Sequence, residues 1–440
     1  MVDKAGPSLS LWKTTAPVRI LPRRLNLWIA GSAVIVGAVA ESARAQITPI
    51  DPAQLVNTTT EGLQIAPDVA RMSDGRFLVV WETLDQPPVD HGVFARYFST
   101  SGDPVGPEFR VDAGPRNHYT YPKVATDDHG FVVVWNHSKD QIVHNVLGRA
   151  FTEDGSPIGP PFAIHQPDEP APTAPDVAAD PAGGYVAVWL APHDGGMAIF
   201  GRKLGASGQP VGPAFPIATG PYSRLGGLDV DAFGPGQFIL GYARQPGPGF
   251  GVYVRAFEAD GELGEEIHVA EGYDDYGIIG LRLGAGSDGS AVVSWGNEIF
   301  HATWYRARLC SPSGEILADV DLGTAPDDVS VERARDGSWL LLSRLADDLV
   351  RGSLYSPQGE LVGSPFDLAS SWNLGVPVAD FDVDSNPVLV GEWYEGGDAS
   401  VDLYARRFRG FGLLLDGFES GDTTRWSATA PGPFRHEWTD

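Results

Sequence analysis

Phe77-Leu-Val-Val-Trp81 begins the pattern that decides the fold, and Phe131-Val-Val-Val-Trp135 repeats it 54 residues further on. The block of β-branched and aromatic residues then returns as Tyr185-Val-Ala-Val-Trp189, Phe238-Ile-Leu-Gly-Tyr242, Ala291-Val-Val-Ser-Trp295, Trp339-Leu-Leu-Leu-Ser343 and Val388-Leu-Val-Gly-Glu-Trp393. Successive blocks end 48 to 54 residues apart, a spacing typical of supersecondary units in repeat proteins. The sequence therefore predicts seven similar units and a structural role for the repeated tryptophans, which are Trp81, Trp135, Trp189, Trp295 and Trp393.

A second repeated block carries an arginine two residues before an aromatic or apolar residue, as in Ala95-Arg96-Tyr97-Phe98. Only the sixth unit lacks the arginine and has Ser353 in its place. Residues two apart on a strand project from the same face, so we expect each guanidinium to stack on an aromatic ring of the neighbouring unit or to pair with an aspartate. Because a catalytic group is needed only once, six copies indicate a scaffold role for Arg96, Arg149, Arg202, Arg255, Arg308 and Arg406.

Each unit contains four short strand signals separated by turn residues, which we name strands a to d in chain order. In the first unit these signals lie at 66–70, 76–81, 92–98 and 108–111. Both faces of strand b are apolar, so we expect each sheet to be covered on both faces. Four-stranded antiparallel units that each stack between two neighbours are typical of a β-propeller. A linear solenoid has the same period but needs a polar cap at each end.

The two ends of the repeat region favour a ring over a solenoid. The seventh unit has no strand d after Phe408, whereas Gln54-Leu55-Val56 aligns with strand d of the first unit, Phe109-Arg110-Val111. Pairing the orphan strand with the last unit removes an exposed sheet edge. The predicted fold is therefore all-β: a seven-bladed β-propeller of four-stranded antiparallel blades over residues 46–411, closed by residues 53–57 of the mature N-terminal strand.

The repeat pattern resembles the propeller-like repeats of secreted bacterial proteins, most of which have no assigned activity. The motif that carries the resemblance is P-x-V-A, a D-G-type turn, F-V-V-V-W and A-R-x-F, and it covers nearly all of residues 50–411. The tail, D-G-F-E-S-G-D at 416–422 with Trp426-Ser427, resembles a segment at the C-terminus of exported bacterial proteins. The resemblance implies a structural motif rather than a catalytic one. For residues 412–440 it leaves export, surface sorting and an ordered appendage open.

The N-terminus has the organisation of a secretory signal peptide. A region with five basic residues precedes the apolar run Leu25–Ala40, and an A-x-A cleavage site ends at Ala45. The apolar run is shorter than the roughly 20 residues that span a bilayer, which favours cleavage over a retained anchor. Removing residues 1–45 changes the formal net charge from −26 to −30. We expect a secreted, surface-attached or periplasmic protein with no transmembrane segment in the mature chain.

Charge and cysteine content exclude several function classes. A net charge of −26 and a pI near 4.6 argue against binding to nucleic acid or to anionic membranes. The single cysteine, Cys310, allows no intrachain disulfide and no cysteine-based zinc site. Cys310 stands where other units carry phenylalanine, so a structural role in the core is expected.

The sequence contains no nucleophile elbow, zinc-protease helix or phosphate-binding loop, so no catalytic motif is evident. Asp380, Asp382 and Asp384 alternate as in calcium loops, but Ser385 and Gly391 stand where an EF-hand-type loop needs glycine and glutamate. The same segment also fits strand a running into its turn. Calcium is therefore the one cofactor considered, and no other is predicted.

The connections that vary most between units are those from d to a and from b to c. Alternating strand directions place all of them on one rim of a propeller, and several d–a loops combine aromatic and polar residues. Aromatic rings with nearby carboxylates and amides suit the binding of sugars or peptides. The rings could equally pack onto adjacent loops, as surface tyrosines do. The candidate ligand-binding residues on this rim are Tyr119, Tyr222, Tyr273, Tyr276 and Trp372.

Three functions from different classes follow from this sequence. The first is a monomeric, exported propeller that binds an extracellular glycan or protein on the variable rim. The second is a polysaccharide hydrolase or lyase that uses rim carboxylates such as Asp274 and Asp275. The third is a structural envelope protein whose rim has no pocket. Because propellers serve all three purposes, the fold does not decide between them, and a binding protein is predicted over an enzyme on the absence of a catalytic motif.

Overall fold

The computed structural model describes residues 48–86, 89–113, 118–127, 129–139, 143–165, 171–222, 225–245, 250–271, 278–299, 302–324, 326–334, 336–345, 349–370, 374–381, 386–394 and 401–409. All of these residues belong to the unit that runs from Arg44 to Asp440, and every named element among them is a β-strand. The predicted signal peptide and the predicted tail lie outside the described residues, so both stay predictions.

Five of the sheets each contain four antiparallel strands in sequence order. The first two consist of β7 (His118–Asp127), β8 (Gly130–Lys139), β9 (Val143–Thr152) and β10 (Phe162–Ala163), and of β11 (Thr173–Ala179), β12 (Tyr185–His193), β13 (Gly196–Leu204) and β14 (Phe215–Tyr222). The next two consist of β15 (Leu225–Gly234), β16 (Gln237–Arg244), β17 (Gly251–Glu258) and β18 (Leu263–Glu271), and of β19 (Ile278–Ala285), β20 (Ala291–Ile299), β21 (Ala302–Cys310) and β22 (Ile316–Gly323). The fifth consists of β23 (Pro326–Arg333), β24 (Trp339–Leu345), β25 (Leu349–Tyr355) and β26 (Phe366–Ser370).

A further sheet of nine strands joins the two ends of the repeat region. It contains β27 (Leu374–Phe381), β28 (Pro387–Tyr394), β29 (Val401–Arg409), β3 (Leu63–Arg71), β4 (Phe77–Gln86), β5 (Val89–Phe98) and β6 (Pro104–Arg110), with β1 (Thr48–Pro49) and β2 (Gln54–Leu55) beside β29. One parallel pair, Val401 opposite Leu63, connects the β27–β29 group to the β3–β6 group. Val56 continues the N-terminal pairing, because its amide donates to the Leu403 carbonyl at 2.7 Å.

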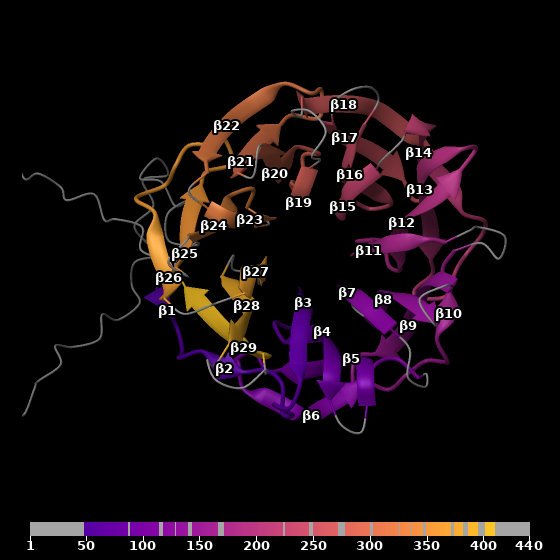
Figure 1. The fold of residues 1–440 in the computed structure, drawn as a ribbon, viewed down its shortest axis with the longest axis vertical. Helices are drawn as coiled ribbons and strands as arrows, with labels where there is room; N and C mark the ends of the chain where they lie inside the picture. The colour runs from indigo at the N-terminus through magenta and orange to yellow at the C-terminus, as the bar shows by residue number, and fades with distance from the viewer. Residues whose placement is uncertain are drawn as a thin grey trace, which may run out of the picture. The chain divides into compact units, whose positions relative to one another are not determined.

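The sheets follow one another around a common axis, with the first strand of each group innermost (Figure 1). Each innermost strand contacts the next one, in the order β3, β7, β11, β15, β19, β23 and β27, and β27 also contacts β3. Within the described residues, and apart from the pair of Leu63 with Val401, the inner edge of these strands has no strand partner, so its backbone amides need other acceptors. Aspartate side chains on the innermost strands supply several of these acceptors.

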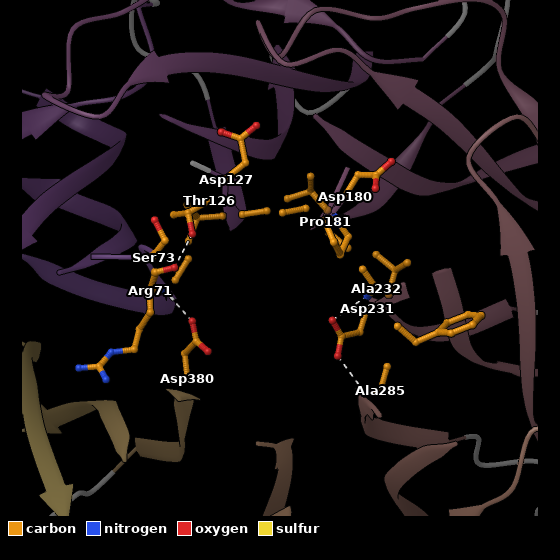
Figure 2. Close-up of a pocket in the computed structure, with 18 of the residues that line it drawn as sticks. Arg71, Ser73, Thr126, Asp127, Asp180, Pro181, Asp231, Ala232, Ala285 and Asp380 are labelled. Carbon is orange, nitrogen blue, oxygen red and sulfur yellow. Dashed lines mark hydrogen bonds between the residues drawn. The ribbon is translucent and has the colours of Figure 1, made fainter. Parts of the chain in front are cut away.

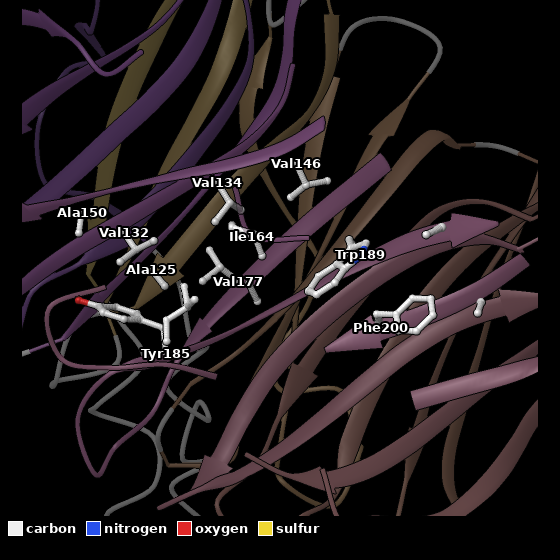
Figure 3. Packing of buried hydrophobic residues seen from close by; sticks show 14 residues of the cluster. Ala125, Val132, Val134, Val146, Ala150, Ile164, Val177, Tyr185, Trp189 and Phe200 are labelled. Atoms are coloured by element: carbon white, nitrogen blue, oxygen red, sulfur yellow. The ribbon is translucent and has the colours of Figure 1, made fainter. Parts of the chain in front are cut away.

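The second strand of each sheet forms the centre of the core between adjacent sheets. Val132 and Val134 of β8 pack in one cluster with Tyr185 and Trp189 of β12 (Figure 3). The alternate residues of β8, such as Val133, belong to the cluster on the other side of the sheet. Both faces of the strand are therefore buried, as the sequence predicts.

The repeated tryptophans lie in these clusters. Trp81, Trp135, Trp189 and Trp295 have no exposed surface. Burying an aromatic side chain of roughly 200 Å² stabilises the fold by about 5 kcal/mol on the transfer scale. The side chain of Trp393 lies outside the described residues, although its backbone belongs to β28.

The innermost strands share a bulge near their first residues. In each of the seven units, the pairing of the innermost strand with the second strand shifts register at this point. The residue at the shift has a positive φ in five units, which are those of Ala66, Tyr121, Ala174, Gly227 and Gly280. A positive φ costs a residue with a side chain of order 1 kcal/mol. At this bulge the Tyr121 side chain is 65% exposed.

The repeated arginines join adjacent units. Arg149 donates from Nη1 to the Val111 carbonyl at 2.8 Å and from Nε to the Gly159 carbonyl at 3.0 Å, and its guanidinium lies 5.3 Å from the Phe151 ring. The Nη1 bond to the preceding unit recurs from Arg96 to Val56, Arg202 to Ile164, Arg255 to Ile217, Arg308 to Val269 and Arg406 to Leu368.

The ring contacts differ from the expected ones, because each ring belongs to the same unit as its arginine. The rings near Arg96, Arg149 and Arg406 belong to the same strand, and the ring near Arg308 is that of Trp295 on the adjacent strand β20. The expected ion pair with an aspartate occurs at Arg308, which lies 2.7 Å from Asp319, and the link to the neighbouring unit is a backbone carbonyl. A strand end leaves carbonyls without a strand partner, and a guanidinium with several donors satisfies them. The sixth unit, with Ser353, lacks this link.

Candidate functional site

The ends of the innermost strands line a cavity of about 920 Å³, which we call the axial cavity (Figure 2). It lies where these strands run into the first turn of each unit, and its walls include small residues such as Ala125, Ala178 and Ala232. Ligand sites in proteins commonly fall between 300 and 1,000 Å³. The cavity is thus large enough for a small oligosaccharide or peptide end.

Asp231 and Asp380 lie on opposite sides of the axial cavity (Figure 2). Asp231 accepts hydrogen bonds from the amides of Ala285, at 2.8 Å, and Ala232, at 2.7 Å. Asp380 accepts them from the amides of Arg71 and Phe381, each at 2.7 Å. Each carboxylate therefore supplies the acceptor that an unpaired inner edge of the next unit requires.

Burial changes the acidity of both groups. Loss of hydration raises the pKa of Asp231 and that of Asp380 from 3.8 to about 6. The hydrogen bonds from backbone amides lower both pKa values but do not cancel the effect of burial. At pH 6 each group is then partly protonated, so it can donate as well as accept a hydrogen bond. This property suits a hydroxyl-rich ligand and also general acid–base chemistry.

Two further carboxylates belong to the turns that line the axial cavity. Asp127 accepts from the Gly184 amide at 3.2 Å, and Asp180 accepts from the Gly236 amide at 2.8 Å. In each case the donor belongs to the next unit, so the carboxylate fixes one turn against another.

Arg71 and Arg333 are the cationic residues that line the cavity. Arg71 donates to the Asn386 carbonyl at 3.3 Å. The Arg333 side chain is only 2% exposed, and it forms a long ion pair with Asp288, at 3.9 Å. Its Nε and Nη1 atoms make no hydrogen bond within the described part of the chain. Burial lowers the pKa of Arg333, which marks its environment as poorly hydrated.

A second layer of charge lies two residues earlier on the innermost strands. Asp68 accepts from the Val124 amide at 2.9 Å and lies 3.5 Å from Lys123. Two more carboxylates accept the equivalent hydrogen bond, Asp176 from the Val230 amide and Asp229 from the Leu283 amide. Burial raises the pKa of Asp68 and, more strongly, that of Asp176. The interior along the axis is thus rich in carboxylates that hold adjacent units together.

A calcium site at the predicted triplet stays untested. Asp380 lies in the axial cavity with its oxygens on backbone amides, whereas Asp382 and Asp384 lie outside the described residues. Among the residues that the structure describes, no three His, Cys, Asp or Glu side chains are grouped closely enough to hold a metal ion. Cys310 is buried in the core, where burial raises the pKa of its thiol to about 11.

The predicted rim residues are only partly described. Tyr273, Tyr276 and Trp372 lie outside the described residues, and the backbone of Tyr119 belongs to β7 but its side chain is not described. The ring of Tyr222 lies 4.9 Å from the Arg244 guanidinium. Arg244 in turn lies 4.0 Å from Tyr253 and pairs with Glu266. One face of the Tyr222 ring is therefore covered by Arg244.

The axial cavity lies at the opposite end of the strands from the predicted rim. Strand a runs from the d–a loop toward the first turn, and the cavity is at that turn. The sequence signal that marks it is a break in the repeat: Asp231 and Asp380 occupy a position where three units carry alanine. The position is recognised only once strand pairing aligns the units residue by residue.

No protein-family model matches the sequence, and no curated protein matches it. Among solved structures, the polysaccharide lyase Uly1 aligns over 86% of this chain and 94% of its own, with a TM-score of 0.52 and 8% identity. The BP39L lectin from Burkholderia pseudomallei aligns over 79% and 95%, with a TM-score of 0.48 and 12% identity. A sialidase from Trypanosoma rangeli aligns over 82% and 58%, with a TM-score of 0.43 and 9% identity.

The similarity to the lyase concerns the fold alone, because identity is so low. Together with the six sheets around one axis, it shows a β-propeller-like all-β repeat fold. Within the described residues, no helix has the length and apolar character needed to cross a membrane.

Proposed function

We propose that the mature chain is an exported, non-catalytic propeller that binds an extracellular glycan. The observation that carries this proposal is the axial cavity, whose volume of about 920 Å³ fits a few sugar residues. Its carboxylates accept hydrogen bonds from sugar hydroxyls, and its small apolar side chains leave room for sugar rings. The fold similarity to a polysaccharide lyase gives the glycan class a precedent among proteins of similar architecture.

We also propose that the seven units are blades of one closed ring. The amide of Arg71 bonds to Asp380, and the amide of Ala66 bonds to Glu392 at 2.8 Å, so the first and last units share two side-chain contacts. The pairing of β1 and β2 with β29 gives the last unit its fourth strand. The bond from Arg96 to the Val56 carbonyl then repeats the link found between the other units.

A glycan array tests the proposed function with the full chain produced in an exporting host. Mass spectrometry of the recovered protein should give Gln46 as the first residue. The variant with Asp231→Asn and Asp380→Asn removes the charge and keeps one of the two acceptor oxygens of each side chain. We expect at least tenfold weaker binding of the glycan that the parent protein retains. The charge-matched control is Asp154→Asn with Asp260→Asn, since both side chains belong to exposed turns away from the cavity.

An unchanged affinity in the Asp231 and Asp380 variant, with its unfolding midpoint preserved, would reject the cavity as the glycan site. Loss of binding in the pair Trp372→Ala and Tyr276→Ala would instead support the predicted rim. Absence of binding to every glycan would favour a protein partner or a structural role in the envelope.

The enzyme alternative is kept because of one observation. Two carboxyl groups with pKa values of about 6 line the same cavity, and an acid–base catalyst of glycan cleavage needs such a group. Incubation of the retained glycan with the protein should release no reducing ends and no unsaturated ends. Release that disappears in the Asp231→Asn variant would make the protein a hydrolase or a lyase.

A further inference from the structure

Trp304 is a large aromatic side chain that remains 42% exposed. It lies near the start of β21, four residues before the repeated arginine Arg308. Tryptophan is unique to this unit, because the six equivalent positions are Gly92, Asn145, Ala198, Gly251, Leu349 and Asp402. A side chain that only one of seven similar units carries is not required by the fold. The exposed position of Trp304 therefore needs an explanation from the residues around it.

The Trp304 indole is held in one orientation. Its Nε1 donates to Oδ1 of Asp321 at 2.6 Å, and the Gly323 amide donates to the same oxygen at 3.0 Å. Arg306 donates from Nη2 to Oδ2 of Asp321 at 2.9 Å. The indole bond, followed by the Gly323 amide and Arg306, holds the pKa of Asp321 below its usual range. The carboxylate is therefore charged at neutral pH and remains a strong acceptor.

With its N–H edge occupied, Trp304 offers solvent the carbon surface of its ring. A preorganised aromatic surface binds at lower entropic cost than a side chain that must first be ordered. The axial C–H groups of a pyranose ring stack on such a surface, and nearby polar groups then bind the sugar hydroxyls. Arg306 and Asp321, which are 33% and 46% exposed, supply those polar groups beside the indole.

The charges around Trp304 favour a neutral sugar. Arg306 pairs with Asp321, and Arg308 pairs with Asp319 at 2.7 Å, so the local charges balance. The chain as a whole has a net charge of −26 and repels polyanions at long range. An anionic polysaccharide thus gains nothing at this site and is disfavoured on approach, whereas a neutral one is not.

The Trp304 surface is separate from the axial cavity. β21 starts at the end of the sheet where β20 finishes, whereas the cavity is at the other end, where β19 finishes. Trp304 therefore lies toward the same end as the predicted variable rim. Sequence analysis missed it because the residue falls inside a predicted strand and not in a loop.

We propose that Trp304, held by Asp321 and flanked by Arg306, is a stacking site for a pyranose ring of a neutral extracellular polysaccharide. This inference rests on the proposed glycan-binding function but not on the axial cavity as its location. A polymer, unlike a free sugar, is long enough to contact this surface and other parts of the same end of the protein.

Affinity electrophoresis of the mature protein tests this site. The gels contain laminarin, xyloglucan or galactomannan as neutral polymers, and alginate or polygalacturonate as anionic ones. We expect retardation by a neutral polymer, a loss of at least tenfold in affinity in Trp304→Ala, and a smaller loss in Trp304→Phe, which keeps a ring. Asp321→Ala should also weaken binding, because the indole is then free to rotate. The control is Leu317→Ala, which changes another exposed apolar residue of the same sheet.

Equal retardation of Trp304→Ala and the parent protein would overturn the inference, as would retardation by anionic polymers alone or by none. The Asp231→Asn and Asp380→Asn variant separates the two proposals in the same gels. If it binds normally while Trp304→Ala does not, the cavity proposal fails and the Trp304 site stands. If the reverse holds, the Trp304 site fails alone.

Discussion

Glu82 is a buried carboxyl group whose protonation makes the stability of the protein depend on pH. Its side chain is 4% exposed, and it accepts a hydrogen bond from the amide of Tyr121 at the shared bulge. Burial, with a smaller contribution from Glu392, raises the pKa of Glu82 from 4.5 to about 7. The native state thus binds a proton between pH 4.5 and 7 that the unfolded chain has released. Stability from this group is complete below pH 4.5 and is lost as the pH rises through 7.

The change Glu82→Gln should remove this pH dependence. Glutamine keeps the acceptor for the Tyr121 amide but has no proton to lose, so the variant should match the parent protein near pH 4.5 and exceed it at pH 8. A pKa difference of 2.5 units corresponds to about 3 kcal/mol. Urea unfolding at a series of pH values measures the difference. The control is Glu153→Gln, an exposed side chain, and identical pH profiles for Glu82→Gln and the parent protein would contradict the argument.

At the scale of strands, the arginine links between units are the repeated structural feature with the clearest energetic consequence. Arg149→Met keeps the apolar stem but leaves the Val111 and Gly159 carbonyls without their donors. Hydrogen bonds from charged groups contribute about 1.5–3 kcal/mol each, so we expect a loss of about 3 kcal/mol in the free energy of unfolding. Arg149→Lys should recover part of it, since one ammonium cannot reach both carbonyls with the same geometry.

Ser353 gives the matched control at the equivalent position of the sixth unit. Ser353→Ala should change the free energy of unfolding by less than about 0.5 kcal/mol, as most substitutions away from special contacts do. Denaturant unfolding monitored by tryptophan fluorescence measures both variants. An Arg149→Met protein as stable as the parent would show that the links add nothing to stability.

The strands could be predicted from the sequence because their signal is local and repeated. The predicted strand b at 76–81 falls within β4, and the predicted strand c at 92–98 falls within β5. The ends of the strands were less accessible: β3 begins at Leu63, three residues before the predicted start, and β6 begins at Pro104 rather than at 108. Both strands have a register shift in their pairing, and period-2 patterns do not reveal such bulges.

The candidate site could not be predicted in the same way. Asp231 and Asp380 are far apart in sequence and meet in one cavity only because the innermost strands converge on a common axis. One of the two amides that donate to each carboxylate belongs to the neighbouring unit, and no local motif encodes that partner. Trp304 could not be predicted for a different reason. A tryptophan within a strand pattern usually indicates a core residue, and only the structure shows that this one is exposed.

At the scale of the molecule, the N-terminal strands should determine whether the last unit is stable. Deleting residues 46–57 removes β1 and β2 from beside β29, together with the hydrogen bond from the Val56 amide and the carbonyl that Arg96 binds, and leaves β28 as the main partner of β29. We expect a lower unfolding midpoint, more rapid proteolysis of the β27–β29 group, and a tendency to associate through the exposed edge. Size-exclusion chromatography and limited proteolysis report these effects.

A synthetic peptide of residues 46–57 supplies the control for this deletion. Added in excess, it should restore the protection of β29, because a strand can pair without a covalent link to the chain. A peptide of the same composition in scrambled order should not. A truncated protein as resistant to protease as the parent would exclude a stabilising role for these residues.

We expect the pairing of Thr48 with Arg409 also to affect the order of events during synthesis. The N-terminal strand, which leaves the ribosome first, cannot pair with its partner until the last strand has been made. Contacts of such long sequence separation slow folding, and unpaired strands remain open to wrong partners meanwhile. The fold is therefore completed only when the whole repeat region has been made, so a chain stalled or cut between Leu374 and Arg409 should keep an open edge that proteases recognise.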